Sequence, residues 1–264
     1  GSVKVWSVAR KELLQTLATS GYIYSVAFSR DGQLIGAGCG DDTIKIWRTL
    51  SGELVHTLKY KGDVGSVAFS PEGDLIAGSC HDGTTKIWRV ADGTVVFTLV
   101  ATGTVAFSPD GSILAVGSSL WNVTDGSQIA VLGNAQTSAF SPDGMLLATD
   151  RQVWRLSDLT LKTNLAVDSR ILSLAFAPDG QRIAAGCRDR TIKIAQVTDG
   201  SVIQVIPAHS HDVNSVAFSP DGRLIASASA DNTVKLWRAT DGVEVATLTA
   251  HTAGISALSF SDGG

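Results

Sequence analysis

Disulfides, membrane spans and basic charge are scarce or absent in this sequence. Its 264 residues include three cysteines, and so small and odd a number argues against a disulfide framework. No apolar run approaches the ~20 residues of a membrane-spanning helix. No signal-peptide pattern opens the chain, although a piece of a longer protein would have lost one. The formal net charge of −4 gives no electrostatic footprint for nucleic acid. We therefore expect neither nucleic acid nor membrane as a partner, and a cytoplasmic location.

Signatures of catalysis are missing too. The sequence has no serine nucleophile elbow, no phosphate-binding loop and no Cys-x-x-Cys pair. His209 and His211 stand close to Asp212, which could suggest a metal site or a proton relay. A repeat described below explains His209 better, and His211 fits an exposed loop residue. We expect no catalytic residue, no metal and no cofactor.

What the sequence does contain is clearest between Val213 and Leu248. Four short apolar runs follow one another there, separated by turn sequences such as Pro-Asp-Gly at 220–222 and Asp-Gly at 241–242. Each run alternates or is β-branched, and each is too short for a helix. The stretch predicts a four-stranded antiparallel meander with strands at Val213–Ser219, Leu224–Ser229, Val234–Arg238 and Val243–Leu248.

Almost every other part of the chain is an edited copy of this meander. The pattern Val-Ala-Phe-Ser-Pro-Asp-Gly is exact at 105–111 and 216–222 and recurs with one or two substitutions in four other copies and in a decayed seventh. The seven copies lie at 26–32, 67–73, 105–111, 138–144, 174–180, 216–222 and 258–264. A tryptophan follows in the same register, except that Ala195 takes its place in the fifth copy. The six tryptophans are Trp6, Trp47, Trp88, Trp121, Trp154 and Trp237. A fixed period of this kind predicts a repeat architecture.

These features resemble the WD-repeat family, with four strands per unit, a period of about 40 residues and a tryptophan closing the third strand. The similarity covers essentially the whole chain. It implies an all-β, seven-bladed β-propeller of four-stranded antiparallel blades, a single domain over 1–264 whose ring is closed by N- and C-terminal strands. Stacked blades would cover both faces of each meander. The expected blades span 18–58, 59–99, 100–132, 133–165, 166–206, 207–248, and 249–264 together with 1–17.

The family's hydrogen-bonded residue set carries over unevenly. WD repeats often join a His before the first strand, a Ser or Thr in the second, an Asp in the turn after it and a Trp in the third. The sixth copy is complete, with His209, Ser227 or Ser229, Asp231 and Trp237. Other copies match in part, with Asp41 and Trp47, Asp82 and Trp88, and Asp189 without a tryptophan. The resemblance implies that these residues are structural. Most other aspartates also fall in repeat turns, where they suit acid–base chemistry poorly.

Cys39, Cys80 and Cys187 align with one another on the second strand of different copies. Equivalent positions in different blades are too far apart for a disulfide. We interpret each cysteine as a small buried residue.

The repeat pattern breaks in two places. Copies three and four are short in the turn between the second and third strands and in the linker to the next first strand. Either these loops are short in the natural protein, which would notch one face, or the printed sequence lacks some loop residues. The closing blade has strands expected at Val3–Trp6, Leu13–Leu17 and Ile255–Phe260 but no sequence for its second strand. We therefore expect the natural protein to extend beyond at least one end, or that strand to be missing here.

A binding surface follows from the resemblance. WD-repeat propellers typically bind partners on the face that carries the linkers between blades and the turns between second and third strands. Tyrosines and arginines there resemble interaction hot spots, whereas the alternative is an ordinary solvated rim. The candidates are Tyr22, Tyr24, Asp63, His81, Arg170, Leu172, Arg188, Asp212, Asn214 and Ser256.

The sequence thus predicts a non-enzymatic platform for a protein or peptide partner. Its expected context is a regulatory or sensor module of a larger intracellular protein or complex. A propeller enzyme or small-ligand binder that uses the central channel is the alternative. A channel-facing cluster of His, Asp or Glu would favour that alternative.

Overall fold

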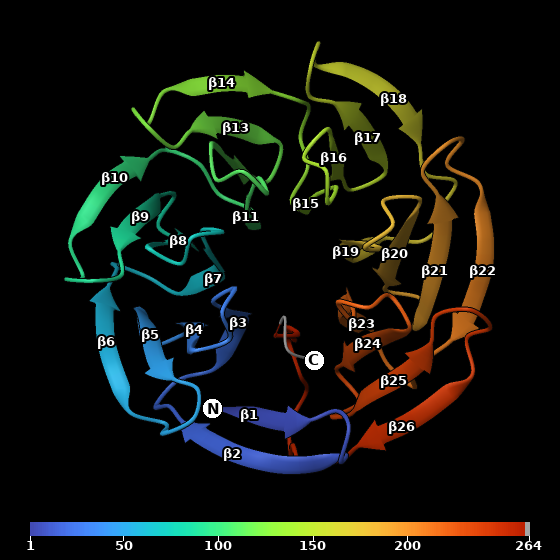
Figure 1. Ribbon diagram of the computed structural model, residues 1–264, viewed down its shortest axis with the longest axis horizontal. Coiled ribbons are helices and arrows are strands. Elements are labelled where there is room, and N and C mark those ends of the chain that lie inside the picture. Colours follow the sequence, from blue (N-terminus) through green and yellow to red (C-terminus); the bar gives the residue numbers. More distant parts are fainter. Residues whose placement is uncertain (262–264) are drawn as a thin grey trace. The chain divides into compact units, whose positions relative to one another are not determined.

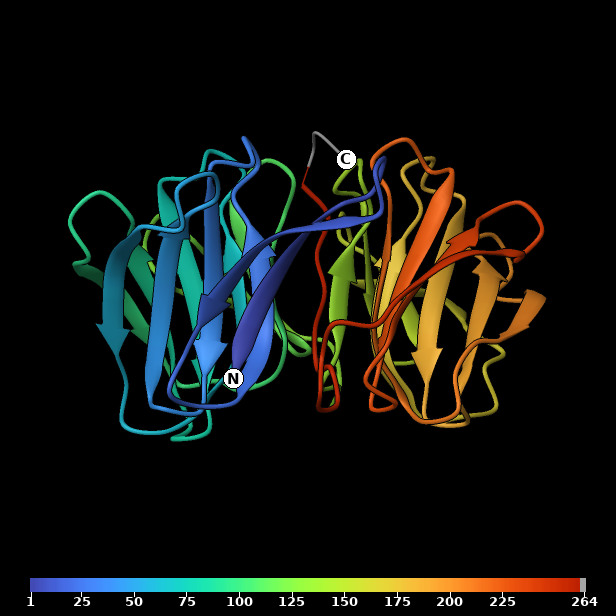
Figure 2. The same ribbon diagram turned by 90° about the horizontal axis from the view of Figure 1, so that it is seen from below.

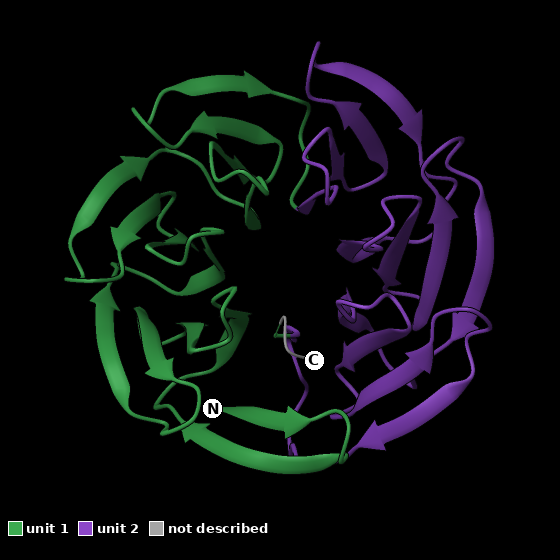
Figure 3. Cartoon of the chain, viewed as in Figure 1, with its two compact units in different colours: residues 1–136, 261–264 green, residues 137–260 purple. Residues whose placement is uncertain are grey.

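In the computed structural model, which describes residues 1–261, the chain forms six four-stranded antiparallel sheets and one two-stranded sheet. Each four-stranded sheet is a meander of consecutive strands, so the fold is all-β and built from propeller blades. Two compact units divide the chain: residues 1–136 with 261 make the first unit, and residues 137–260 make the second (Figure 3). Within each unit, the first strands of neighbouring blades lie closer together than the fourth strands do (Figure 1). Residues 1–261 contain no helix long and apolar enough to cross a membrane.

The first unit contains the two-stranded sheet and three blades. The two-stranded sheet pairs β1 (Ser2–Ser7) with β2 (Glu12–Ala18). Blade 1 consists of β3 (Ile23–Phe28), β4 (Leu34–Cys39), β5 (Thr43–Arg48) and β6 (Leu54–Lys59). Blade 2 consists of β7 (Val64–Phe69), β8 (Leu75–Cys80), β9 (Thr85–Arg89) and β10 (Val95–Leu99). Blade 3 consists of β11 (Val105–Phe107), β12 (Ile113–Val116), β13 (Ser119–Asn122) and β14 (Gln128–Val131).

The second unit contains the other three blades. Blade 4 consists of β15 (Ser138–Phe140), β16 (Leu146–Thr149), β17 (Gln152–Arg155) and β18 (Thr160–Asn164). Blade 5 consists of β19 (Ile171–Phe176), β20 (Arg182–Cys187), β21 (Thr191–Gln196) and β22 (Val202–Pro207). Blade 6 consists of β23 (Val213–Phe218), β24 (Leu224–Ser229), β25 (Val234–Arg238) and β26 (Glu244–Leu248).

A serine, an aspartate and a glycine form the turn between the first and second strands of a blade. In blade 1, Ser29 Oγ donates to Asp31 Oδ1 at 2.6 Å and accepts the Leu34 N–H at 2.9 Å. Gly32 supplies the positive φ, 68°, that the turn requires. This geometry explains why Ser-x-Asp-Gly marks the copies. The serine-to-aspartate bond recurs at Ser108 and Asp110, Ser141 and Asp143, and Ser219 and Asp221.

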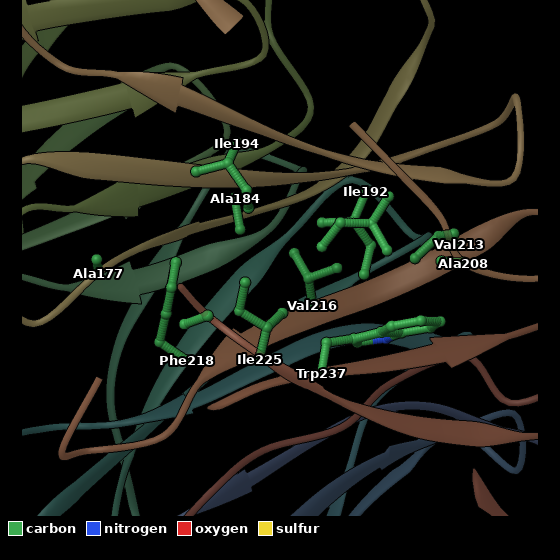
Figure 4. Packing of buried hydrophobic residues seen from close by; sticks show 12 residues of the cluster. Ala177, Ala184, Ile192, Ile194, Ala208, Val213, Val216, Phe218, Ile225 and Trp237 are labelled. Atoms are coloured by element: carbon green, nitrogen blue, oxygen red, sulfur yellow. The ribbon is translucent and has the colours of Figure 1, made fainter. Parts of the chain in front are cut away.

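Aliphatic side chains fill the space between neighbouring blades of a unit. In the second unit, Ile192 and Ile194 of β21 belong to one buried cluster with Val216 of β23 and Ile225 of β24 (Figure 4). All four side chains are at most 4% exposed. Burying one such side chain contributes about 1.5–3 kcal/mol. Stacking therefore covers sheet faces that a lone meander would leave in water.

A repeated serine ties the first strand of one blade to the next blade. In the first unit, Ser66 Oγ of β7 accepts the Val105 N–H of β11 at 3.0 Å. In the second unit, Ser173 Oγ of β19 accepts the Val216 N–H of β23 at 3.2 Å. The first strand is an edge strand of its own sheet, so on that side its backbone groups have no neighbouring strand to pair with. The serine hydroxyl supplies the missing acceptor.

Residues 1–261 form six four-stranded blades, so the prediction of seven blades is wrong. Among the described residues, β1 and β2 pair only with each other. Residues 255–260, expected as the first strand of that blade, form no strand. The Ile255 N–H donates to the Ser229 C=O at 2.9 Å, and the Leu258 N–H donates to Ser215 Oγ at 3.3 Å.

These single bonds hold residues 255–260 in place without making a strand, because a strand needs a ladder of paired backbone groups. No second strand among residues 1–261 supplies that ladder. Closure by terminal strands therefore stays a prediction. Residues 262–264, which end the decayed copy, lie outside the described residues.

The short third and fourth copies form the blades with the shortest connections. Gly117 and Ser118 alone join β12 to β13, and Asp150 and Arg151 alone join β16 to β17. Gly117 has a φ of 56°, and a Cβ there would lie 2.5 Å from the Ala135 carbonyl oxygen. Only glycine fits this turn without displacing the backbone beside it.

Replacing Ser66 with alanine should lower the free energy of unfolding by about 1–3 kcal/mol, because the buried Val105 N–H loses its acceptor. Chemical denaturation of the purified chain measures this change. The exposed Ser51 provides the control, and Ser51→Ala should shift stability by no more than about 0.5 kcal/mol. A Ser66→Ala effect as small as that of the control would mean that the hydroxyl does not hold the two blades together.

Candidate functional site

Blade 6 carries the complete polar set as one chain of hydrogen bonds. Trp237 Nε1 donates to Ser227 Oγ at 2.8 Å, and Ser227 Oγ lies 2.7 Å from His209 Nε2. On the other side of the imidazole, His209 Nδ1 lies 2.9 Å from Asp231 Oδ2. The sequence left Ser227 and Ser229 open, and the structure places Ser227 in the chain. Ser229 accepts the Asp231 N–H at 3.1 Å within the turn. The set therefore fixes the linker before β23 to the second and third strands.

Burial and hydrogen bonding set the protonation states of this group. Burial lowers the pKa of His209 below its usual value, so the imidazole is neutral at neutral pH. Burial by itself raises the pKa of Asp231, but hydrogen bonds from Thr233 and the Ser210 N–H outweigh it and hold that pKa well below the usual range. A neutral His209 that donates to Asp231 from Nδ1 accepts the Ser227 hydroxyl proton at Nε2. The His209 Nδ1–H and the Ser227 hydroxyl thus each have one acceptor, as expected of residues that stabilise the fold.

Blades 1 and 2 keep the tryptophan but not the histidine. Trp47 is buried in the core of the first unit. In blade 2, Tyr60 takes the place of the histidine: Trp88 Nε1 donates to Tyr60 Oη at 3.1 Å, and Tyr60 Oη donates to the Gly78 C=O at 2.8 Å. Gly78 occupies the position of the serine, so the larger phenol reaches the backbone instead. The only sign of this replacement in the sequence is the Tyr at the position of the His.

Blades 3 and 4 show how the tryptophan depends on the second strand. In blade 4, Trp154 Nε1 donates to Thr149 Oγ1 at 3.0 Å, and Thr149 takes the position of the serine. In blade 3 the same position holds Val116, which has no hydroxyl. Trp121 Nε1 is accordingly buried without a hydrogen-bond partner among the described residues. The tryptophan therefore persists where its polar partner is lost.

Blade 5, with Ala195 in place of the tryptophan, uses a buried lysine. The Lys193 side chain is 7% exposed, and its ammonium group donates to Asp189 Oδ2 at 2.7 Å and to Asp168. Burial by itself lowers the pKa of Lys193, but the bonds to these two carboxylates outweigh it and raise that pKa. The sequence reasoning placed Asp189 in a turn and missed Asp168 and Lys193. Asp168 lies 25 residues from Lys193 along the chain, so no local pattern marks the pair.

Asp41 and Asp82 belong to turns. Burial by itself raises the pKa of Asp41, but hydrogen bonds from Lys45 and Ser20 outweigh it and lower that pKa to about 2. Asp82 accepts the Thr84 hydroxyl at 2.7 Å and the Thr84 N–H at 2.9 Å. Carboxylates held in this way stabilise turns and are poorly suited to proton transfer.

The three cysteines are free and buried. Burial raises the pKa of Cys39 to about 11 and that of Cys187 to about 12, and it also raises the pKa of Cys80. Such thiols are poor nucleophiles and poor metal ligands at neutral pH. Within residues 1–261, no three His, Cys, Asp or Glu side chains gather in a way that could hold a metal ion.

We define the linker end of a blade as the end where its second strand turns into its third and the linker from the preceding blade arrives. The strands of each unit run between this end and the opposite one (Figure 2).

In the first unit, Tyr24, Asp63 and His81 meet at the linker end. Tyr24 Oη donates to Asp63 Oδ2 at 2.9 Å, and the Tyr24 and His81 ring centroids are 5.9 Å apart. The hydrogen bond to the carboxylate raises the pKa of Tyr24. Tyr22, two residues earlier, is 77% exposed.

In the second unit, Arg170, Arg188 and Asp212 meet at the linker end. The Arg188 N–H donates to the Arg170 C=O at 3.0 Å, and Arg188 Nε lies 3.8 Å from Asp212 Oδ2. All three residues were candidates from the sequence, and the structure brings them together across blades 5 and 6.

The other three candidates of the second unit differ in their surroundings. Asn214 Nδ2 donates to the Ile255 C=O at 2.9 Å, so its amide group anchors the segment that starts at Ile255. Leu172 is half-buried on β19, and Ser256 is exposed.

Replacing Val116 with threonine should leave the free energy of unfolding unchanged or raise it by up to about 1 kcal/mol, because the new hydroxyl can accept the orphaned Trp121 Nε1–H. The same change at the fully buried Val213 offers no tryptophan partner and should cost about 1–3 kcal/mol. Denaturant titration of both variants makes the comparison. Equal losses at both sites would contradict the assigned role of this position.

Stability should fall as pH drops below about 6.5, because an unfolded histidine binds a proton there while the buried His209 does not. Its folded pKa lies below the unfolded one, so its contribution is present above the unfolded pKa and is lost as pH falls toward the folded value. In His209→Gln this loss, up to about 1.4 kcal/mol per pH unit, should disappear from the pH profile of the unfolding free energy. The exposed His211→Gln is the control, and a wild-type pH slope in His209→Gln would refute the assignment.

Comparison with known families agrees with this architecture. The family model for "WD domain, G-beta repeat" matches residues 11–48, 52–89, 159–195 and 200–238, which together make up more than half of the chain. Each matched segment begins at or just before the fourth strand of one sheet, or β2 of the two-stranded sheet, and ends within or at the end of the third strand of the next. One sequence repeat thus spans two neighbouring sheets.

No curated protein matches the chain. The match over these four segments, together with the meander blades, shows that the protein belongs to the family of WD domain, G-beta repeat proteins.

Proposed function

We propose that this protein is a non-catalytic platform that binds a protein or peptide partner at the linker end of its blades. Propellers of this family typically act as scaffolds for protein interactions. The observation that carries the proposal is the aromatic group of the first unit. Tyr22 is largely exposed, and Tyr24 stands beside His81 with its hydroxyl bonded to Asp63.

This group has the physical character of a binding hot spot. Tyrosine offers a large, rigid, amphipathic surface at a low cost in side-chain entropy. The bond from Tyr24 to Asp63 joins blade 1 to blade 2 and fixes the phenol before any partner arrives. A fixed side chain loses less freedom on binding, which favours affinity. Exposed Tyr22 then adds apolar area next to this fixed group.

The state of the polar residues supports a non-catalytic role. The turn aspartates accept several hydrogen bonds each, which lower their pKa values and keep them charged. His209 is buried within its own hydrogen-bond chain. We also propose a cytoplasmic location, which the three buried free cysteines fit, since reducing compartments keep thiols unpaired.

The double variant Tyr22→Ala/Tyr24→Ala should lose at least about tenfold of its partner recovery, since two hot-spot side chains each contribute about 1–2 kcal/mol. Affinity capture with quantitative mass spectrometry, using wild type and variant side by side, measures the loss for each recovered protein. Leu50→Ala/Leu54→Ala removes comparable exposed apolar area elsewhere in blade 1 and is the matched control. Equal recovery of the same proteins by the tyrosine variant and by wild type would rule out this end of blades 1 and 2 as the binding surface.

A further inference from the structure

Two arginines face each other across the first and second strands of blade 5. Arg170 precedes β19 and Arg188 follows β20. Ile171 pairs with Cys187 in the ladder, and the Arg188 N–H bonds to the Arg170 C=O at 3.0 Å, so the two arginines are directly opposite each other. Side chains of opposite residues lie on the same face, with Cβ atoms about 4.5–5.5 Å apart. The same backbone bond joins the equivalent pairs of other blades, which are Tyr22 with Gly40, Asp63 with His81, and Asp212 with Ala230.

The arginine pair is poorly neutralised. The Arg188 side chain is 63% exposed and approaches Asp212 only at 3.8 Å. Arg170 is exposed, and its guanidinium group forms no hydrogen bond or ion pair with any residue in 1–261. A third cation lies close by, because Arg151 Nη2 donates to the carbonyl oxygen of Ser169, the residue before Arg170.

The acidic residues closest to these arginines in the sequence already bind a lysine. Asp168 and Asp189 both bind the ammonium group of Lys193. Arg190, exposed in the same turn, also forms no side-chain ion pair with a described residue. Residues 168–170 and 188–193 carry four cationic side chains and two carboxylates, so the linker end of blade 5 is positive although the whole chain carries a net charge of −4.

Like charges directly opposite each other destabilise a sheet. The fold does not require this pair, since none of the equivalent pairs in blades 1, 2 and 6 sets two like charges against each other. A destabilising arrangement that the fold does not need is typical of a binding site. Guanidinium groups bind carboxylates through paired N–H donors, and an anion between the arginines would remove their repulsion.

We propose that Arg170 and Arg188, with Arg151 beside them, bind the carboxylates of an acidic peptide segment rich in Asp or Glu. This inference rests on the proposed function, because it names the chemistry of the partner that the platform takes. An extended peptide with consecutive acidic residues can place one carboxylate against each guanidinium group. The exposure of the pair leaves both groups accessible to such a segment.

A fluorescently labelled hexaglutamate peptide, titrated with the full chain and followed by anisotropy, tests the proposal. We expect saturable binding that weakens with added salt, and no binding of the matching hexaglutamine peptide. Arg170→Gln/Arg188→Gln should weaken binding by at least about tenfold. Arg155→Gln/Arg238→Gln removes the same charge from exposed third-strand arginines of blades 4 and 6 and should stay within about twofold of wild type.

Equal losses in the two double variants would overturn the site, because they would reflect net charge alone. Absence of hexaglutamate binding would overturn it as well. Binding of a phosphoserine hexapeptide without binding of hexaglutamate would overturn the assignment to carboxylates. If Tyr22→Ala/Tyr24→Ala still abolishes partner recovery in these cases, the platform stands and only the acidic class fails.

Thermal unfolding gives an independent readout. Removing one of two opposed charges should raise the midpoint of unfolding of Arg170→Gln by about 1–2 °C over wild type without the peptide. Saturating hexaglutamate should raise the midpoint of wild type but not that of the double variant. A lower midpoint for Arg170→Gln would show that the arginine stabilises the blade, and it would overturn the argument from repulsion.

Discussion

Each blade is a sheet whose two faces are both apolar, and covering those faces is the constraint on which the rest of the structure depends. Ile192, Ile194, Val216 and Ile225 show the solution in the second unit, where the third strand of one blade packs on the first and second strands of the next. The serine bonds, such as that from Ser66 to the Val105 N–H, satisfy the backbone where two blades meet. A blade is therefore stable only beside another blade.

The polar set of the WD repeat is secondary to this packing. Blade 6 has the full chain of His209, Ser227, Asp231 and Trp237, yet blade 3 leaves Trp121 without a partner and still forms four strands. Apolar burial supplies most of the stability of each blade, so the hydrogen bonds can be replaced one by one. The replacements differ chemically, from a phenol in blade 2 to an ammonium group in blade 5.

The turn aspartates and the polar set of the WD repeat stabilise the fold. The side chains that differ between blades and can contact a partner therefore lie at the linker ends. The linker end of the first unit presents tyrosines and a histidine around Asp63. The linker end of blade 5 presents opposed arginines with few acids to neutralise them. Both groups occupy equivalent backbone positions, so the repeat provides a common frame and the side chains provide specificity.

Local pattern in the sequence was enough to determine the strands, their meander order and the turns of six blades, because alternation and Ser-Pro-Asp-Gly act over a few residues. The resemblance to the WD-repeat family added the candidate residues of the linker ends, since each lies at a fixed offset in the repeat. The local pattern could not predict which residues pair between segments that are distant in the sequence. Only the tertiary structure decided that Ser227 and not Ser229 joins His209, that Asp168 reaches Lys193, and that Arg170 stands opposite Arg188. It also decided against a seventh blade, since residues 255–260 match the repeat in sequence but find no ladder partner within residues 1–261, and a strand exists only as a member of a pair.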